Sequence, residues 1–290
     1  TCIYMFSSCS NLQSPCRITF KYLSGETINA YGFCDASGVS SLPNNMFSGT
    51  VGELFLGQAF YKCTNLSSVS SGAFNYTTNG GTQCNETFYG CTSLLNVSGV
   101  TIPDIRNASS MFQNSGLTTI TSSLFSDSPY CESYAHCFSG CRNLRTAGSQ
   151  GSPITPPEHS VTVNINSMFE GCSNLQSAEY AFGDVTVNKP GPTGTDNSYI
   201  ESGVLKHIDS CTDTFSGCSN MTSQPRWDCI VAGVKFPSAY MPLFYYFKRI
   251  FQPYQFGFPD VDSISKSGCF RGCTKMNGYD QYISAYPEWF

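Results

Sequence analysis

Apolar and polar residues follow one another along this chain in a short pattern that recurs nine times. A small or apolar residue precedes Phe, two variable positions follow, and Cys, two polar residues and Leu or Met complete the pattern. The copies are marked by Phe6, Phe33, Phe60, Phe88, Phe112, Phe138, Phe169, Phe215 and Phe270. These phenylalanines are 24 to 31 residues apart as far as Phe169, and the last two intervals lengthen to 46 and 55 residues. A period in the twenties predicts a solenoid of short stacked coils.

Seven copies keep the Cys three residues after the Phe, and two copies are weaker. The copy at Phe33 has no Cys in register and ends at Val39, and the copy at Phe112 reaches its Leu one residue early. The cysteines of the full copies are Cys9, Cys63, Cys91, Cys141, Cys172, Cys218 and Cys273. We expect each of them to occupy a tight inner position, as a small and weakly polar hydrophobe.

A coil of about 25 residues cannot bury its own apolar face, so it must stack on a neighbour that carries the same face. We expect the Phe and the Leu of each copy to point inward from a short helical or turn segment. Each buried side chain then contributes roughly 1.5–3 kcal/mol. The leucines of this predicted core are Leu12, Leu66, Leu94, Leu117, Leu144 and Leu175.

A branched or small residue often follows the Leu by three positions, which predicts a short strand in each coil. These residues are Val69, Val97, Ile120, Ala147 and Ala178. A second apolar contact is expected on the return side of the coils, from Leu42, Met46–Phe47, Phe74 and Leu124–Phe125. The predicted fold class is therefore an α/β repeat solenoid, with a short parallel strand and a helical turn in each repeat and irregular insertions near the C-terminus.

The segments Phe88–Leu94 and Phe169–Leu175 resemble the core motif of the BspA-like leucine-rich repeats. That family occurs in surface proteins of bacteria and parasitic protists and in some phage proteins. The resemblance implies a right-handed, curved solenoid that is used for adhesion or binding, and it implies no catalytic activity.

Composition narrows the classes of partner. Only 12% of residues are charged, the net charge is −5 and the pI is near 5.1, which argues against nucleic acid because phosphates require a basic surface. The unbroken repeat predicts one elongated domain over residues 1–290, regular over 1–182, with insertion-bearing repeats and a cap over 183–290. The chain opens inside a repeat without a polar capping unit, which indicates a processed N-terminus or a segment of a longer polypeptide.

The sixteen cysteines indicate structure rather than a cofactor site. Equivalent residues one coil apart favour free buried thiols over disulfides, although some of the nine scattered cysteines could pair in an oxidising compartment. No Cys-x-x-Cys motif is present, so we expect neither zinc nor any other cofactor.

Residues 236–258 form an insertion that contains ten aromatic residues, interrupted by prolines and by charged residues that exclude a transmembrane helix. One interpretation is that the insertion covers the last coil as a cap, with the aromatic tail 286–290 against it. The other is that it forms a contact surface, because aromatic side chains dominate interface energetics. The candidate interface residues are Tyr240, Phe244, Tyr245, Tyr246, Phe247, Phe251 and Tyr254.

Catalysis finds little support in the sequence. Only three histidines are present, and none of them lies in a nucleophile motif. We therefore expect a non-enzymatic, extracellular or cell-surface adhesion module that binds a host protein or glycan. The alternative is a structural protein of a virus or phage particle, such as a fibre, tail or decoration subunit that contacts neighbouring subunits. Low charge, abundant Ser and Thr, and free thiols suit both hypotheses.

Overall fold

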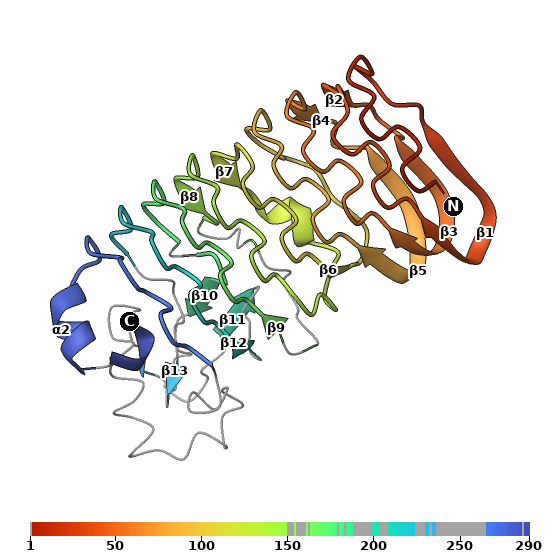
Figure 1. The fold of residues 1–290 in the computed structure, drawn as a ribbon. Helices are drawn as coiled ribbons and strands as arrows, with labels where there is room; N and C mark the ends of the chain where they lie inside the picture. The colour runs from red at the N-terminus through yellow and green to blue at the C-terminus, as the bar shows by residue number, and fades with distance from the viewer. Residues whose placement is uncertain are drawn as a thin grey trace.

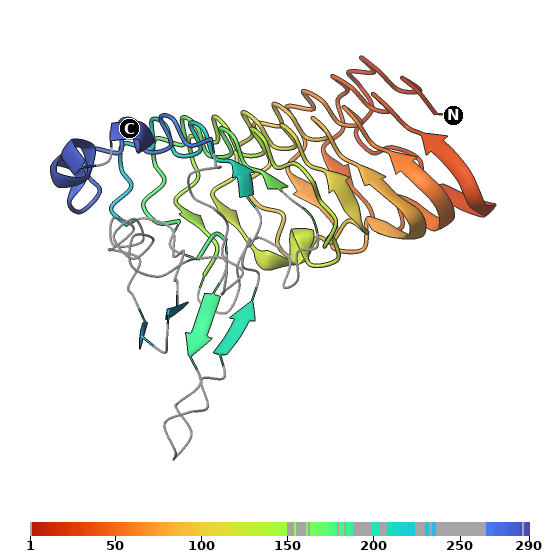
Figure 2. The ribbon, with the colours of Figure 1, turned by 90° about the horizontal axis from the view of Figure 1, so that it is seen from below.

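The chain forms an elongated stack of coils, with the N-terminus at one end and the C-terminus at the other (Figure 1). The structure is a computed structural model that describes residues 2–149, 154, 161, 163–178, 180–182, 184–187, 199–202, 208–223, 230–231, 234–235, 265–285 and 287–290. The predicted solenoid is confirmed. Each coil has three sides, and corresponding sides of successive coils lie next to one another (Figure 2).

One side of the stack is a parallel sheet of long strands. It contains β1 (Ile18–Asn29), β3 (Phe47–Phe55), β5 (Phe74–Gln83) and β6 (Ile105–Asn107), in that order. Parallel bridges through Ser133 continue it to β9 (Val163–Asn164) and then to β12 (Ile208–Ser210), whose Ser210 pairs with Ser265. β1, with 12 residues, is the longest of these strands.

The second side carries the short strands predicted after each Leu. β2 (Ser41–Leu42) pairs with β4 (Ser68–Val69), and β7 (Thr119–Ile120) pairs with β8 (Thr146–Ala147). The row continues through the bridges Thr146–Ser177 and Ser177–Ser223. Val97 is the exception, because it is buried in a segment without strand structure.

The third side, which contains the repeated motif, is not helical, so the predicted helical turn per repeat is wrong. Residues two before and two after the Phe adopt left-handed backbone conformations, as at Gln58 (φ 54°) and Lys62 (φ 53°) around Phe60. A left-handed residue at every fourth position interrupts any right-handed helix. We call this side the turn ladder; it runs from four residues before the Phe to two after it, for example residues 56–62.

Hydrogen bonds of the turn ladder alternate between two directions. The N–H of Phe60 donates to the carbonyl of Thr87 in the next coil (2.9 Å), whereas the N–H of Tyr61 donates to the carbonyl of Gln58 in its own coil (3.0 Å). Every second peptide therefore joins neighbouring coils. In the described part of the chain, helical structure is limited to η1 (Ser122–Phe125), α2 (Tyr279–Ala285) and η4 (Pro287–Trp289). The protein is a parallel β-solenoid.

Two antiparallel strand pairs belong to the insertions. β10 (Asp184–Val187) pairs with β11 (Tyr199–Ser202), and β13 (Ile230–Val231) pairs with β14 (Val234–Lys235). Figure 2 shows the β10–β11 hairpin projecting away from the coils. Residues 189–197, which are rich in Pro and Gly, lie outside the described residues.

A stack of phenylalanine rings runs through the core. Phe88 and Phe112 have ring centroids 5.2 Å apart and planes 10° apart, and Phe215 and Phe270 follow at 5.6 Å and 3°. The same near-parallel contact joins Phe60 to Phe88, Phe112 to Phe138, Phe138 to Phe169 and Phe169 to Phe215. Such pairs contribute about 0.5–1.5 kcal/mol each beyond area burial. The second apolar contact expected on the return side is confirmed, because Leu42, Met46, Phe47, Phe74, Leu124 and Phe125 are all buried.

The second coil has its motif one residue away from the predicted register. The N–H of Cys34 donates to the carbonyl of Ala59 (2.7 Å), as that of Phe60 does to Thr87, and left-handed Gly32 and Ala36 flank Cys34. Cys34 therefore occupies the slot that Phe holds in the other coils. Phe33 precedes that slot and meets Phe6 edge-on, with planes 89° apart.

Candidate interaction surface

The repeated cysteines form a ladder of buried thiols whose role is structural. Cys63 Sγ donates to the carbonyl oxygen of Cys34 (2.9 Å), and Cys91 Sγ donates to that of Phe60 (3.1 Å). The same bond to the preceding coil, at 3.1 Å, is made by Cys141, Cys172, Cys218 and Cys273. The slot requires a residue that is both small and a hydrogen-bond donor, which a thiol satisfies.

Burial also removes the reactivity of these thiols. Desolvation raises the pKa of Cys141 to about 11 and that of Cys273 to about 12. Because the thiolate is the reactive form, thiols with such pKa values are inert near pH 7. All fifteen cysteines in the described part of the chain are free.

The structure buries most of the predicted core residues. Phe33, Phe60, Phe88, Phe112, Phe138, Phe169, Phe215 and Phe270, and the leucines Leu66, Leu94, Leu117, Leu144 and Leu175, are at most 2% exposed. The first copy differs, since Phe6 and Leu12 are half-buried and Cys9 is exposed. Cys9 holds the same place in its coil, with its N–H donating to the carbonyl of Phe6 (3.3 Å), but it is exposed because the described chain has no coil in front of it.

Four tyrosines form an aromatic surface along the turn ladder of the first coils. The rings of Tyr61 and Tyr89 stack with centroids 4.8 Å apart, and Tyr4 meets Tyr31 edge-on at 5.7 Å. Gly57, in the coil after Tyr31, leaves room for that ring, because a Cβ there would lie 2.9 Å from Cδ2 of Tyr31. We call Tyr4, Tyr31, Tyr61 and Tyr89 the tyrosine surface.

Polar side chains surround the tyrosine surface. Gln58 Nε2 donates to Glu86 Oε2 (2.6 Å), Asn114 Nδ2 donates to the hydroxyl of Tyr89 (3.1 Å), and Lys62 Nζ lies 5.1 Å from the centroid of the Tyr61 ring. Burial raises the pKa of Tyr31, with smaller contributions from Tyr4 and Glu86, so its hydroxyl stays protonated at neutral pH. Half-buried aromatic rings beside amide and charged groups suit binding of protein or sugar.

Rows of polar side chains extend across the outer face of the long-strand sheet. Thr77 Oγ1 donates to Thr50 Oγ1 (3.1 Å), and Asn75 Nδ2 donates to Asn45 Oδ1 (2.7 Å). These residues are exposed, whereas Phe47, Phe74 and Tyr76, on the opposite face of the strands, are buried. The outer face of these strands is therefore polar, with polar side chains that pair from one coil to the next, and the inner face packs on the apolar core.

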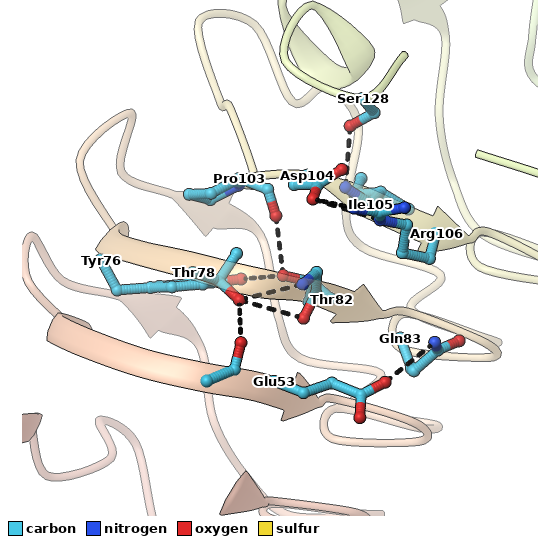
Figure 3. Close-up of polar contacts among 12 residues, drawn as sticks. Glu53, Tyr76, Thr78, Thr82, Gln83, Pro103, Asp104, Ile105, Arg106 and Ser128 are labelled. Atoms are coloured by element: carbon cyan, nitrogen blue, oxygen red, sulfur yellow. Dashed lines mark hydrogen bonds and ion pairs between the residues drawn. The ribbon is translucent and has the colours of Figure 1, made fainter. Parts of the chain in front are cut away.

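A network of hydrogen bonds links β3, β5 and the segment that precedes β6 (Figure 3). The Tyr76 hydroxyl lies 2.7 Å from Thr82 Oγ1, which donates to the carbonyl of Pro103 (2.7 Å), and Thr78 Oγ1 donates to the carbonyl of Gly52 (2.6 Å). Burial raises the pKa of Tyr76 well above its ordinary value. The network satisfies polar groups where the pairing of β3 and β5 shifts register, so it has a structural role.

A partly exposed ion pair lies beside this network. Arg106 Nη2 contacts Asp104 Oδ2 (2.7 Å), and its guanidinium carbon lies 4.6 Å from the centroid of the Tyr130 ring (Figure 3 shows the Arg106–Asp104 contact). The described residues contain no group of three or more His, Cys, Asp or Glu arranged to hold a metal ion. Among the same residues, no helix has the length and apolarity to cross a membrane.

The aromatic insertion predicted as an interface lies outside the described residues, including Tyr240, Phe244, Tyr245, Tyr246, Phe247, Phe251 and Tyr254. The tail covers the end of the stack. Trp289 is buried and stacks on Phe270 with centroids 6.2 Å apart, and the N–H of Phe270 donates to the carbonyl of Trp289 (2.9 Å).

Sequence reasoning missed the tyrosine surface, although a signal for it existed. Tyr61 and Tyr89 each follow the motif Phe directly and are 28 residues apart, which is the repeat distance. No protein-family model matches the chain, and neither curated proteins nor solved structures give a significant match.

Proposed function

We propose that this protein is a non-enzymatic surface module that binds an extracellular protein or glycan. The tyrosine surface carries the proposal, because aromatic rings held at fixed spacing on a rigid backbone bind with little loss of conformational entropy. Hydrogen bonds between coils fix the backbone beneath them at Tyr31, Gly57 and Lys62. The resemblance of the motif to BspA-like repeats points to the same class of function.

The polar surroundings of the tyrosines add specificity. Gln58, Lys62, Glu86 and Asn114 offer donors, acceptors and both signs of charge within the same surface. Away from the tyrosines, near the starts of β3 and β5, the Thr50–Thr77 and Asn45–Asn75 rows offer further hydroxyl and amide groups. Sugars are recognised by such a combination of aromatic rings with hydroxyl and amide partners.

The test is direct binding of the intact chain to an immobilised glycan array and to a panel of extracellular matrix proteins. We expect Tyr61→Ser combined with Tyr89→Ser to weaken binding roughly tenfold or more, as for aromatic hot spots. Tyr130→Ser is the matched control, since Tyr130 is exposed outside the turn ladder. Equal weakening by the control, or no binding to either panel by the unmodified chain, would refute the proposal.

A second candidate is a structural subunit of a virus or phage particle, and the free thiols favour it. A reducing cytoplasm, in which such particles assemble, preserves free cysteines. Titration of thiols in the denatured chain separates the two candidates. Sixteen free thiols support assembly in the cytoplasm, whereas several disulfides support secretion through an oxidising compartment.

A further inference from the structure

Asparagines that begin an Asn-x-Ser/Thr sequence are concentrated in one part of the chain. Five of the six asparagines between residues 65 and 107 begin such a sequence, whereas one of the thirteen asparagines elsewhere does so. This sequence, the sequon, is the acceptor for N-linked glycosylation in exported proteins. The six sequons begin at Asn65, Asn75, Asn85, Asn96, Asn107 and Asn220.

Three of the sequons share one pattern of burial. The asparagine is exposed, the next residue is buried, and the Ser or Thr that follows is exposed again. The middle residue packs in the core, so the amide and the hydroxyl on either side of it are both held in solvent. A glycan is bulky and hydrated, so it requires an acceptor of this kind. These three sequons are Asn65-Leu66-Ser67, Asn75-Tyr76-Thr77 and Asn96-Val97-Ser98.

N-linkage replaces one hydrogen of the asparagine amide. An oligosaccharide joined to a polyprenol through a diphosphate supplies the sugar. A bond forms between its anomeric carbon and Nδ2, the bond to the diphosphate oxygen breaks, and one Nδ2 proton is released. The second Nδ2 hydrogen remains a donor. At Asn75 the bond from Nδ2 to Asn45 Oδ1 (2.7 Å) is therefore compatible with a glycan and orients the linked sugar.

The sequon on the turn ladder is engaged in the fold. Thr87, which completes the sequon of Asn85, is buried, and its hydroxyl donates to the carbonyls of Leu56 (3.0 Å) and Cys84 (2.9 Å). Asn85 itself is half-buried, and a Cβ at Gly57 would lie 3.1 Å from its Nδ2. A sugar on this amide would meet the backbone of the preceding coil.

The other two sequons are also held by neighbouring groups. Asn107 Oδ1 accepts from the N–H of Ser109 (2.9 Å). Asn220 Nδ2 donates to the carbonyl of Ser173 (2.8 Å), and its Oδ1 accepts from Lys275 Nζ (2.5 Å). Both asparagines are half-buried, so a sugar at either position displaces packed groups.

The three exposed sequons lie on two sides of the stack. Asn75 is in β5, on the long-strand sheet, whereas Asn65 and Asn96 lie on the short-strand side, next to β4 and to its equivalent in the following coil. Figure 1 shows β4 and β5 on different sides of the stack. The third side of the same coils is the turn ladder, with Tyr61 and Tyr89, and its sequon is the packed one.

We propose that Asn65, Asn75 and Asn96 carry N-linked glycans, which cover the two strand sides of these coils and leave the turn ladder open to a partner. This inference rests on the proposed extracellular function, since the transfer occurs on exported chains. Bulky, hydrated glycans exclude partners from the sides that carry them. The glycans thus direct a protein or glycan ligand to the tyrosine surface.

The full chain, exported from insect cells behind a signal peptide, provides the test. Transfer precedes folding, so chains that are modified at a packed asparagine fail to fold and are not secreted. Peptide-N-glycosidase in heavy-oxygen water converts each modified asparagine to a labelled aspartate, and mass spectrometry gives the occupancy of every sequon in the secreted chain. We expect the three exposed sequons to be occupied roughly fivefold more often than the three packed ones.

Matched variants check the assignment at one site. Ser98→Ala should remove the glycan from Asn96, whereas Ser98→Thr should keep it. Equal occupancy of all six sequons would overturn the proposal. Unmodified asparagines at the three exposed sequons, in the secreted chain or in the protein from its own source, would overturn it as well.

A glycan placed on the turn ladder tests whether this side is the one left open. Lys62→Asn creates a sequon with Thr64, and residues 62–64 have the same exposed, buried, exposed pattern. Lys62 is left-handed (φ 53°), a conformation that asparagine adopts readily. We expect the new glycan to weaken binding by the tyrosine surface roughly tenfold relative to Lys62→Gln, which removes the same charge without adding a glycan. Equal binding by the two variants, with the new glycan present, would contradict the open turn ladder.

The two measurements have separate outcomes for the glycans and for the binding function. Occupancy is measured without any ligand, so glycans at the exposed sequons of a chain that binds nothing would refute the proposed function alone. Binding through the tyrosine surface by a chain whose exposed sequons stay unmodified would refute the glycans alone.

Discussion

The full copies of the motif and the two short copies solve the same packing problem differently. In a full copy such as Cys172–Leu175, the thiol bonds the preceding coil and Leu follows three residues later. In the short copies Ser37-Gly38-Val39 and Ser115-Gly116-Leu117, serine replaces the thiol and one residue is missing. The hydroxyl of Ser115 contacts Cys141 Sγ of the next coil (3.3 Å), and that of Ser37 contacts Cys63 Sγ (3.5 Å).

The missing residue brings the backbone of the short coil against the preceding coil. The N–H of Gly116 donates to the carbonyl of Cys91 (3.2 Å), and that of Gly38 donates to the carbonyl of Cys9 (3.0 Å). A Cβ would lie 2.1 Å from the carbonyl oxygen of Thr92 at Gly116, and 1.9 Å from that of Ser10 at Gly38. Both kinds of copy therefore keep the anchor slot and the hydrogen bonds between coils. The segment that follows the anchor can lose one residue, provided that glycine stands where this segment meets the preceding coil.

The largest expected effect separates a phenylalanine anchor from the Cys34 anchor of the second coil. Phe138→Ala should lower the free energy of unfolding by about 3–5 kcal/mol, because the ring stacks on Phe112 and Phe169 and leaves a cavity. Cys34→Ala, at the equivalent slot of the second coil, should cost much less because fewer buried atoms are removed. Chemical denaturation of both variants measures the difference. Equal losses would contradict the assignment of Cys34 to the anchor slot.

The next largest loss of stability is expected from replacing the glycine of a short copy. Gly116→Val should destabilise the fold by roughly 3 kcal/mol, because its side chain meets the backbone of Thr92. Ser173→Val, at the equivalent position of a full copy, should change the unfolding free energy by less than about 0.5 kcal/mol. Thermal and urea unfolding of the pair test this. A tolerated Gly116→Val would mean that the short coil has room to move outward.

Sensitivity to alkali is expected where a full copy buries its motif thiol. Burial, partly offset by the Ser115 hydroxyl, raises the pKa of Cys141 from 9.0 to about 11. The unfolded thiol therefore ionises first, so this contribution to stability is intact below pH 9 and is lost as pH rises toward 11. At pH 10 the loss is about 1.4 kcal/mol for Cys141 alone. Unfolding measured from pH 8 to 10 should show a shallower decline for Cys141→Ser than for the unmodified chain; parallel declines would argue against the burial of this thiol.

The smallest expected effect tests whether the cysteine position requires a hydrogen-bond donor or only apolar volume. Cys172→Val keeps the volume but removes the S–H donor to the carbonyl of Phe138, so it should cost about 1 kcal/mol. Cys172→Ser keeps a donor and should retain more stability than Val does. Denaturant midpoints of the two variants decide the matter. If Val equals or exceeds the unmodified chain, apolar volume alone determines the slot.

Part of the candidate surface was open to prediction and part was not. The period located Phe60, Phe88 and their cysteines, and Tyr61 and Tyr89 follow from the same register. The predicted helical turn failed because Phe, Cys and Leu at spacings of three residues fit a helix as well as a ladder of turns. The side-chain types of Gln58, Glu86 and His136 do not reveal that their backbone is left-handed. Among the ladder positions, Gly90 and Gly140 do suggest a left-handed backbone, because glycine adopts it without steric cost.

The sequence by itself determined that the chain stacks coils, because a unit of under thirty residues cannot bury its apolar face alone. It also determined which residues recur at the core. Only the tertiary structure decided the register of Cys34, the direction of the hydrogen bonds between coils, and the packing of Trp289 on Phe270. These features depend on which backbone groups of one coil meet those of the next, and that is a property of the assembled stack rather than of any single repeat.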